Sequence, residues 1–172
     1  MMNEEQQTND FGQVKAGIEI ENREQFVTFI IEDEYYGVEI LKVQEIVGMT
    51  RITSVPNMAH YMRGVINLRG KVVPVVDMRL KFNMDEREYD AVTVILIVEV
   101  KGREIGMIVD SVSDVVDIPG DQIQNTPHFN AGIDTNYIHG IGNVNDMLVI
   151  LLDVNKILSS DELEKIDQNS SE

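Results

Sequence analysis

Short runs of β-branched and aliphatic residues, separated by polar turn residues, fill most of this chain and predict strands rather than helices. The segment 25–31 and the one after it, which reaches Ile40, are expected to form a hairpin. The segment 91–100 and the residues that follow Lys101-Gly102 are expected to form a second hairpin. Four further strands are expected at 64–69, 71–77, 138–144 and 147–153.

Turn residues indicate where these hairpins reverse. Gly70 and Asn145-Asp146 each separate two apolar runs, and Lys101-Gly102 has the form of a tight two-residue turn. Pro74 stands inside an apolar run. Because proline lacks the amide hydrogen that a sheet uses, the strand 71–77 is expected to be an edge strand or to carry a bulge.

Helical signals are few. The apolar residues of Ile40–Ile46 are spaced as in one or two helical turns. Near the C-terminus, Ser159 followed by Glu162 fits a capping box, and Leu163 and Ile166 then share one helix face. The pattern predicts a mainly β protein with short helices and one C-terminal helix.

The chain contains an internal repeat. Residues 139–158 resemble 63–82 at a shift of 76 (140 − 64), and residues 105–116 resemble 36–47 at a shift of 69 (106 − 37). The two shifts differ by seven, so the second copy carries seven extra residues, expected around Thr126–Asp134. The retained pairs include Gly64–Gly140, Asn67–Asn143, Asp77–Asp153 and Glu45–Asp114, whereas His139 and Asn145 replace Arg63 and Arg69.

The repeat predicts two related subdomains built as small β-barrels. Each half is too small to bury a comfortable core alone, so the halves are expected to pack together and leave a groove between them. Only the first copy keeps its arginines, which indicates a binding surface built mainly on that half.

Composition limits the function classes. The chain has 172 residues, no cysteine and a formal net charge of −16. Without cysteine there are no disulfides, thiolate metal sites or cysteine nucleophiles. The acidic charge argues against binding to nucleic acid or to an anionic membrane surface, since both need clustered Lys and Arg.

The chain has no targeting or membrane signal. No apolar run approaches the ~20 residues of a membrane-spanning helix, and the polar N-terminus is unlike a signal peptide. We therefore expect a cytoplasmic protein without direct membrane insertion. Residues 1–24 and 167–172 are polar and are expected to be flexible tails.

Catalytic and cofactor motifs do not emerge. His60, His128 and His139 lack the spacing of a zinc site, and the sequence has no Walker loop, dinucleotide loop or serine elbow. The sequence therefore predicts no enzyme activity, no metal and no cofactor.

Arg69 is the strongest candidate contact residue. It ends a strand just before a glycine turn, where its guanidinium would project from the rim of the barrel, and arginine is favoured at protein interfaces. The alternative is a surface ion pair with an acid such as Glu45, and both roles can hold at once. Val43 either belongs to the core, which is slightly favoured, or points into the groove.

Four motifs carry a family resemblance: EYYGVEILKVQEI (34–46), MRGVINLRGKVVPVVDMRLKF (62–82), IGMIVDSVSDVV (105–116) and YIHGIGNVNDMLVILLDVNKIL (137–158). Together they resemble the chemotaxis coupling protein family, CheW, across residues 25–166. The resemblance implies two intertwined five-stranded SH3-like barrels that exchange elements near 83–91.

The resemblance also implies a function. A non-catalytic adaptor would link the cytoplasmic tips of chemoreceptors to the regulatory domain of the histidine kinase CheA, and adaptor rings could form in receptor arrays. The matching receptor-binding positions are Val43, Glu45 and Arg69. The expected kinase-binding positions are Val112, Val115 and Phe129.

Two other function classes are weighed against the adaptor. A small-ligand sensor would use the groove between the barrels as its pocket, but aromatic residues are only 6% of the chain and tryptophan is absent. An enzyme would need a nucleophile or metal that the motifs do not supply.

Overall fold

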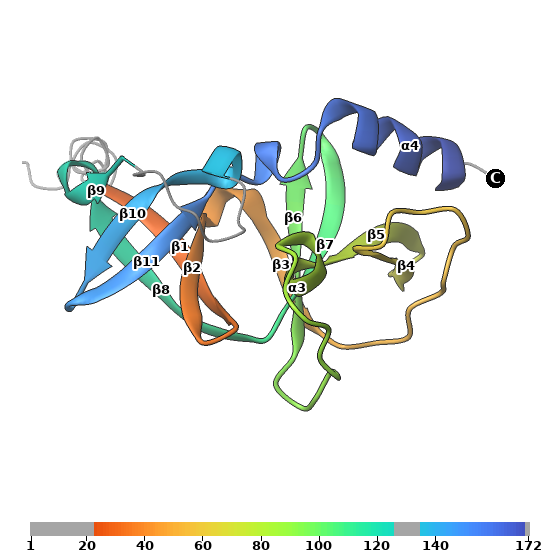
Figure 1. The fold of residues 1–172 in the computed structure, drawn as a ribbon, viewed down its shortest axis with the longest axis horizontal. Helices are drawn as coiled ribbons and strands as arrows, with labels where there is room; N and C mark the ends of the chain where they lie inside the picture. The colour runs from red at the N-terminus through yellow and green to blue at the C-terminus, as the bar shows by residue number, and fades with distance from the viewer. Residues whose placement is uncertain (1–22, 126–134, 171–172) are drawn as a thin grey trace, which may run out of the picture.

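Strands dominate the structure, a computed structural model that describes residues 23–125 and 135–170 (Figure 1). The strands are β1 (Arg23–Ile31), β2 (Glu34–Glu39), β3 (Val43–Gly48), β4 (Met62–Leu68), β5 (Lys71–Asp77), β6 (Val94–Val100), β7 (Arg103–Val109), β8 (Ser111–Pro119), β9 (Ile123–Gln124), β10 (Ile138–Val144) and β11 (Met147–Leu152). The helical elements are η2 (Ile40–Lys42), α3 (Met78–Lys81), η3 (Gly120–Gln122), η4 (Thr135–Tyr137), η5 (Val154–Lys156) and α4 (Ser160–Ser170).

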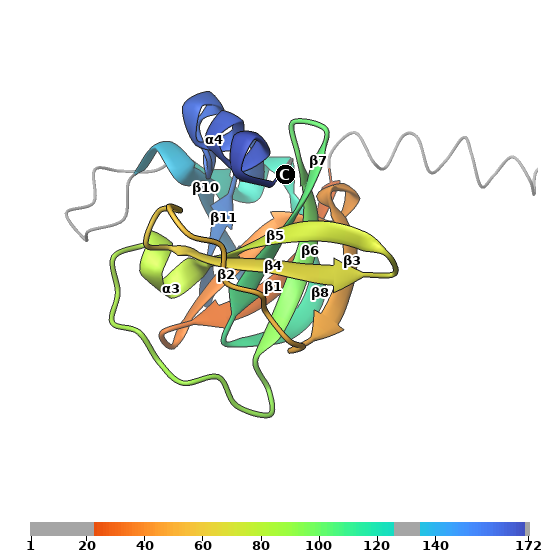
Figure 2. The same ribbon diagram turned by 90° about the vertical axis from the view of Figure 1, so that its right-hand side faces the viewer.

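The strands form two sheets that lie at opposite ends of the molecule (Figure 1). Figure 2 views the molecule from the end that carries β4 and β5. The six-stranded sheet has the order β8-β1-β2-β11-β10-β9, and the five-stranded sheet has the order β3-β6-β7-β5-β4. Each sheet combines strands from both halves of the sequence. The predicted mainly β fold with two intertwined SH3-like subdomains is confirmed.

The internal repeat is visible in the pairing. Shifting β4 by 76 residues gives the bounds of β10, and both sheets contain the same type of parallel contact, β5 with β7 and β11 with β2. The caps repeat as well: the amide of Asp77 donates to the Tyr61 carbonyl at 2.8 Å, and the amide of Asp153 donates to the Tyr137 carbonyl at 2.9 Å. The two sheets are therefore copies of one design.

The halves exchange hairpins at places other than the predicted one. Strands β3 to β7 follow one another within the five-stranded sheet, so the chain stays in that sheet through 83–91. It crosses between sheets at η2 and again at Asp110, between β7 and β8. The β1–β2 hairpin from the first half of the chain therefore pairs within the six-stranded sheet, whose other strands come from the second half. The β6–β7 hairpin from the second half pairs within the five-stranded sheet, whose other strands come from the first half.

Two local predictions are corrected. Only η2 is helical within Ile40–Ile46, because from Val43 onward the chain pairs with β6. The strand that contains Pro74 is not an edge, since β5 lies between β7 and β4. Its pairing with β7 starts only at Val75, so no partner there requires an amide hydrogen from Pro74. The register shift in this hairpin falls on β4, between Met62 and Gly64.

The C-terminal helix is confirmed together with its capping box. The Glu162 amide donates to Oγ of Ser159 at 3.0 Å, and the Ser159 amide donates to Oε1 of Glu162 at 2.6 Å. Leu163 and Ile166 are buried. The helix continues to Ser170, so the expected tail from 167 is shorter than predicted, and residues 1–22, 126–134 and 171–172 lie outside the described part of the chain.

A central hydrophobic cluster joins the two sheets. It contains buried side chains from β1, β2, β6, β7, β11 and α4, and a stacked series of rings runs through it. Ring centroids are 6.1 Å apart for Phe29 and Tyr36, 5.6 Å for Tyr36 and Phe82, and 6.0 Å for Phe82 and Tyr137. Because both halves contribute to one core, neither sheet packs independently of the other.

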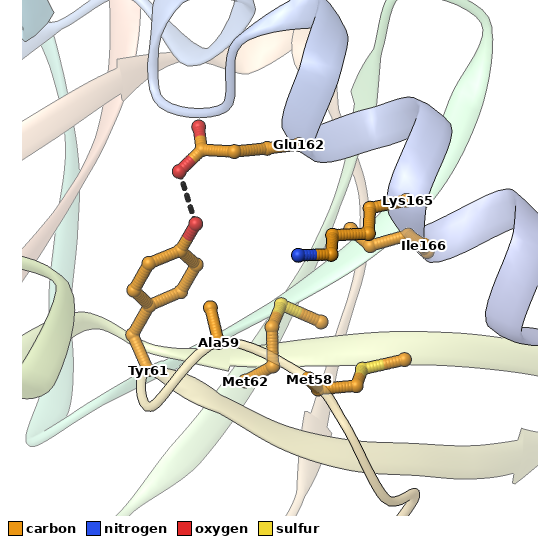
Figure 3. A pocket seen from close by; sticks show the side chains of 7 residues that line it. All are labelled: Met58, Ala59, Tyr61, Met62, Glu162, Lys165 and Ile166. Atoms are coloured by element: carbon orange, nitrogen blue, oxygen red, sulfur yellow. Dashed lines mark hydrogen bonds between the residues drawn. The ribbon is translucent and has the colours of Figure 1, made fainter.

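The C-terminal helix leaves the six-stranded sheet and lies over the five-stranded one (Figure 1). Figure 3 shows its contact with the chain before β4: the Tyr61 hydroxyl donates to the Glu162 carboxylate beside a cavity of about 120 Å³. Lys81 pairs with the same carboxylate at 3.2 Å and lies 4.2 Å and 5.3 Å from the ring centroids of Tyr61 and Tyr137. The helix thus follows the strands of one subdomain and packs against the other, which connects the two.

Candidate partner-binding surfaces

Arg69 is held at the tip of the β4–β5 hairpin by the geometry of its turn. Arg69 and Gly70 have φ values of 53° and 87°, as a two-residue type I′ turn requires. The Gly70 amide donates to Oδ1 of Asn67 at 2.8 Å and fixes the reversal. The Arg69 side chain is 70% exposed, so its guanidinium projects from the sheet as the sequence predicted.

Glu45 binds this guanidinium through both carboxylate oxygens. Nη1 of Arg69 donates to Oε2 of Glu45 at 2.9 Å, and Nη2 donates to Oε1. This hydrogen bond holds the pKa of Glu45 below its usual value. Glu45 lies on β3 and the Arg69 turn follows β4, which are the two outer strands of the five-stranded sheet. The pair therefore connects the two edges of the sheet, as expected when a sheet curls toward a barrel.

Val43 packs against the core and still retains part of its surface. It lies opposite Val98 on β6, while Glu45 lies opposite Ile97, so the strand carries an extra residue at Gln44. The side chain is half-buried and contacts the edge of the central cluster. The favoured core contact of Val43 is thus present.

Exposed apolar side chains lie on the elements that carry the Arg69–Glu45 pair or adjoin it. Leu41 on η2 is 88% exposed, Ile46 on β3 is 44% exposed and Val72 on β5 is 62% exposed. Isolated exposed aliphatics are ordinary, but here Ile46 and Val72 lie on the strands next to the ion pair, and Leu41 lies on η2 directly before β3. Charged and apolar groups of this kind are what a protein interface uses.

The predicted kinase-binding valines lie in different environments. Val112 on β8 lies opposite Phe29 and is half-buried against the central cluster. Val115, three residues further along, lies opposite Val27 and is 47% exposed. Phe129 lies outside the described residues. Only Val115 of the described pair offers a large free surface.

The same positions are exposed in both copies. Val115 is the repeat counterpart of Ile46, and Leu148, which is 61% exposed, is the counterpart of Val72. The two subdomains therefore display equivalent apolar positions, while the ion pair next to them occurs only in the first copy, since Asn145 replaces Arg69.

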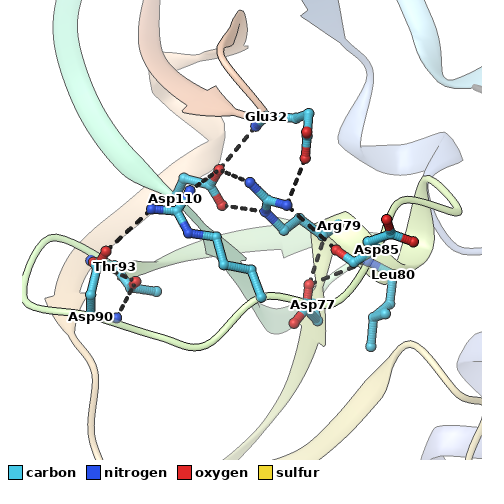
Figure 4. A network of polar contacts seen from close by, with 9 residues as sticks. Glu32, Asp77, Arg79, Leu80, Asp85, Asp90, Thr93 and Asp110 are labelled. Carbon is cyan, nitrogen blue, oxygen red and sulfur yellow. Dashed lines mark hydrogen bonds and ion pairs between the residues drawn. The ribbon is translucent and has the colours of Figure 1, made fainter.

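Sequence reasoning missed a polar network at the crossing between the sheets (Figure 4). Nε and Nη2 of Arg79 donate to the two oxygens of Asp110 at 2.9 Å and 2.8 Å, and Arg79 also pairs with Glu32 at 2.6 Å. The Glu32 amide donates to Oδ2 of Asp110 at 2.9 Å. One available signal was the loss of this arginine in the second copy, where Asn155 replaces Arg79.

The described residues form neither a metal-ligand cluster nor a membrane-spanning helix. Within 23–125 and 135–170, no group of three or more His, Asp or Glu side chains is placed to hold a metal ion. None of the helices described there is long and apolar enough to span a membrane.

The fold defines a class before any comparison is made: a scaffold of two intertwined SH3-like β subdomains joined by one core. The family model described as CheW-like domain matches residues 25–162. The chain belongs to the CheW family of chemotaxis scaffold proteins.

Individual relatives agree with this assignment. The chain is 39% identical to the chemotaxis protein CheW of Klebsiella aerogenes over 84% of this chain and 87% of that protein. It is 36% identical to the chemotaxis protein CheW of Helicobacter pylori over 87% and 92% of the two chains. The crystal structure of the scaffolding protein TtCheW from Thermoanaerobacter tengcongensis superimposes with a TM-score of 0.76 at 32% identity, covering 81% and 94% of the chains.

Proposed function

We propose that this scaffold couples the cytoplasmic tips of chemoreceptors to the histidine kinase CheA and brings kinase activity under receptor control. The observation that carries the proposal is the Arg69–Glu45 pair on an exposed hairpin turn, beside the half-buried Val43. These three positions match those that the family resemblance assigns to receptor binding.

The geometry of the pair suits a helical partner. Glu45 occupies one side of the Arg69 guanidinium, which leaves the exposed face free to stack on apolar side chains or to donate further hydrogen bonds. The neighbouring Leu41 and Ile46 supply apolar surface. A receptor helix that presents apolar side chains beside an acceptor would satisfy both.

The second subdomain is proposed to bind the regulatory domain of the kinase through Val115, with the half-buried Val112 on the same strand and Phe129 at a further contact. Binding both partners on one rigid core raises the effective concentration of kinase near receptor. This role requires no catalysis by the scaffold itself, and closed adaptor rings in arrays would use the same surfaces.

The test is an assembly of receptor cytoplasmic fragment, kinase and this protein, with Arg69→Asp compared against Lys101→Asp. Lys101 is a matched control, because Lys101-Gly102 forms the equivalent turn of the β6–β7 hairpin, with φ values of 53° and 82°. Arg69→Asp should lose receptor binding and retain kinase binding, while Lys101→Asp should retain both.

A charge swap separates the two roles of Arg69. If the double variant Glu45→Arg with Arg69→Glu restores receptor binding, the ion pair acts by shaping the turn. If binding stays lost while the fold is intact, Arg69 contacts the receptor itself. Loss of both partners by Arg69→Asp would contradict the division of surfaces, and a wild-type protein that binds neither partner would refute the coupling function.

A further inference from the structure

A polar pocket of about 220 Å³ opens at the junction of the two subdomains, at the end of β11. Its lining includes Glu39, Lys42, His139, Asp153 and Asn155. Neither Glu39 nor Lys42 forms an ion pair with any residue in the described ranges 23–125 and 135–170. The pocket therefore contains polar groups of both signs that are available to a ligand.

In the first copy of the internal repeat, the site equivalent to this pocket is filled. The counterparts of Asp153, Asn155 and Glu39 in the other copy are Asp77, Arg79 and Ile108, and these three residues line a space of only about 10 Å³. The remaining walls of that space come from the chain between α3 and β6, including Tyr89, and from Asp110. The segment that follows the first copy thus fills the site that stays open in the second.

Tyr89 is the group that occupies the first copy. Its hydroxyl donates to Oδ2 of Asp77 at 2.7 Å, while Oδ1 of Asp77 accepts from the Arg79 amide at 2.9 Å. The Arg63 guanidinium lies 5.9 Å from the centroid of the Tyr89 ring. The site therefore recognises an aromatic ring by a cation and its hydroxyl by a carboxylate.

The second copy keeps the carboxylate, has a histidine in place of the arginine, and lacks the ring. Oδ1 of Asp153 accepts from the Asn155 amide at 3.0 Å, repeating the Asp77 cap, but Oδ2 accepts no hydrogen bond from the residues that the structure describes. His139 stands where Arg63 stands in the first copy. After Asp153 the chain turns through η5 into α4, which packs on the other subdomain, so no part of 154–170 returns to fill the pocket.

We propose that this pocket binds a phenolic group, with the ring beside His139 and the hydroxyl donating to Oδ2 of Asp153. The pocket has a volume of about 220 Å³, whereas only about 10 Å³ remains beside Tyr89 in the first copy, so the second copy has room for a ring. Lys42 and Glu39 at the junction provide polar contacts for atoms attached to the ring. The proposal rests on the repeat and the pocket alone, and does not depend on the coupling function.

A phenolic group can come from a tyrosine of a partner chain or from a free small molecule. The first copy holds its tyrosine within a segment without regular secondary structure, 84–90, so a tyrosine with backbone on both sides occupies the equivalent site there. Probes with and without that backbone therefore distinguish the two sources.

The experiment is an amide NMR titration of the full-length protein with N-acetyl-tyrosinamide, with N-acetyl-phenylalaninamide as the control that lacks only the hydroxyl. Saturable shifts at residues 139 and 152–155, with a dissociation constant on the order of 1 mM and at least about fivefold weaker binding of the phenylalanine probe, are expected. Equal binding of the two probes, shifts elsewhere, or no saturable shift would overturn the proposal.

Two variants test whether the NMR shifts arise from binding at the Asp153 carboxylate. Asp153→Asn keeps an oxygen for the cap and removes the second acceptor, so binding should weaken at least about fivefold. Asp146→Asn, an exposed carboxylate change at the opposite end of the β10–β11 hairpin, should leave binding unaltered. If Asp153→Asn does not fold, His139→Ala serves instead, and unchanged affinity in whichever variant folds contradicts the assignment.

A third probe identifies the source. If p-cresol binds and the tripeptide Gly-Tyr-Gly does not, the ligand is a free phenol. If the tripeptide binds at least as tightly as N-acetyl-tyrosinamide, the ligand is a tyrosine of a partner chain.

Discussion

Replacing Arg79 by Met should destabilise the protein more than any other single change of a charged residue at the sheet crossing. Arg79 holds Asp110 through two hydrogen bonds at the point where the chain passes from β7 to β8. The two side chains are only 11% and 14% exposed. Methionine preserves the length and apolar contacts of the side chain and removes the charge. The loss in free energy of unfolding therefore measures the ion pair and not the creation of a cavity.

The expected loss follows from the burial of the partner that remains. Breaking a buried ion pair costs about 3–5 kcal/mol, mainly because one charge is left unpaired. Here Arg87 stays 3.3 Å from Asp110 and solvent reaches part of the site, so we expect about 2–4 kcal/mol. Against a typical total of roughly 5–15 kcal/mol, this is a large fraction of the folding free energy.

Urea unfolding at neutral pH measures the effect, with Arg87→Met as the matched control. Arg87 pairs with the same carboxylate but is 48% exposed, so its removal should cost less than about 1 kcal/mol. A loss for Arg79→Met no larger than that for Arg87→Met would refute the reasoning, since burial would then not determine the strength of the pair.

The pH dependence gives an independent check. Burial raises the pKa of Asp110, but hydrogen bonds from Arg79 and the Glu32 amide outweigh it and leave that pKa below its usual value. A lowered pKa means that the stabilisation is present above the unfolded value of about 3.9 and is lost as the pH falls through the folded value. The difference between wild type and Arg79→Met should therefore shrink in acid, and a constant difference would contradict the assignment.

Three further changes test other parts of the fold. Gly64→Ala should cost more than about 2 kcal/mol by thermal unfolding, because φ is 138° there and a Cβ would overlap a backbone carbonyl oxygen. Tyr89→Phe should cost about 1–3 kcal/mol in urea by leaving an oxygen of the buried Asp77 without its donor. Tyr61→Phe should lower hydrogen-exchange protection of α4. It should also raise the pKa of Glu162, which burial raises but the Tyr61 hydroxyl, the Ser159 amide and Lys81 together lower, so the helix should loosen at a higher pH than in wild type.

Local signals predicted most of the fold because they depend on neighbouring residues. The hairpin turns at Gly70 and Lys101-Gly102 and the capping box at Ser159 are all present. Ile40–Ile46 was predicted helical because an extra residue in a strand changes its alternation toward helical spacing. Only pairing with β6, some fifty residues away, reveals a strand there.

Site residues could be predicted where a local sequence motif marks them. They could not be predicted where only the tertiary structure brings them into contact. The Arg69–Glu45 pair was among the expected alternatives, because the glycine turn placed Arg69 at the rim of the barrel and Glu45, 24 residues before it, was the acid named as a possible partner. Arg79 and Asp110 are 31 residues apart, and nothing in the sequence singles out this acid among 30. The exchange of hairpins is what brings them together.

The exchange also explains why one copy could lose its arginines. Each sheet borrows a hairpin from the other half, and both pack on one core, so the stability of either subdomain is shared by the whole chain. The first copy is closed by Arg69–Glu45 at its rim and by Arg79–Asp110 at the crossing. The second copy has Asn145 and Asn155 at these positions and relies on the shared core instead. A duplicated scaffold that shares one core in this way can change the surface of one half without unfolding it.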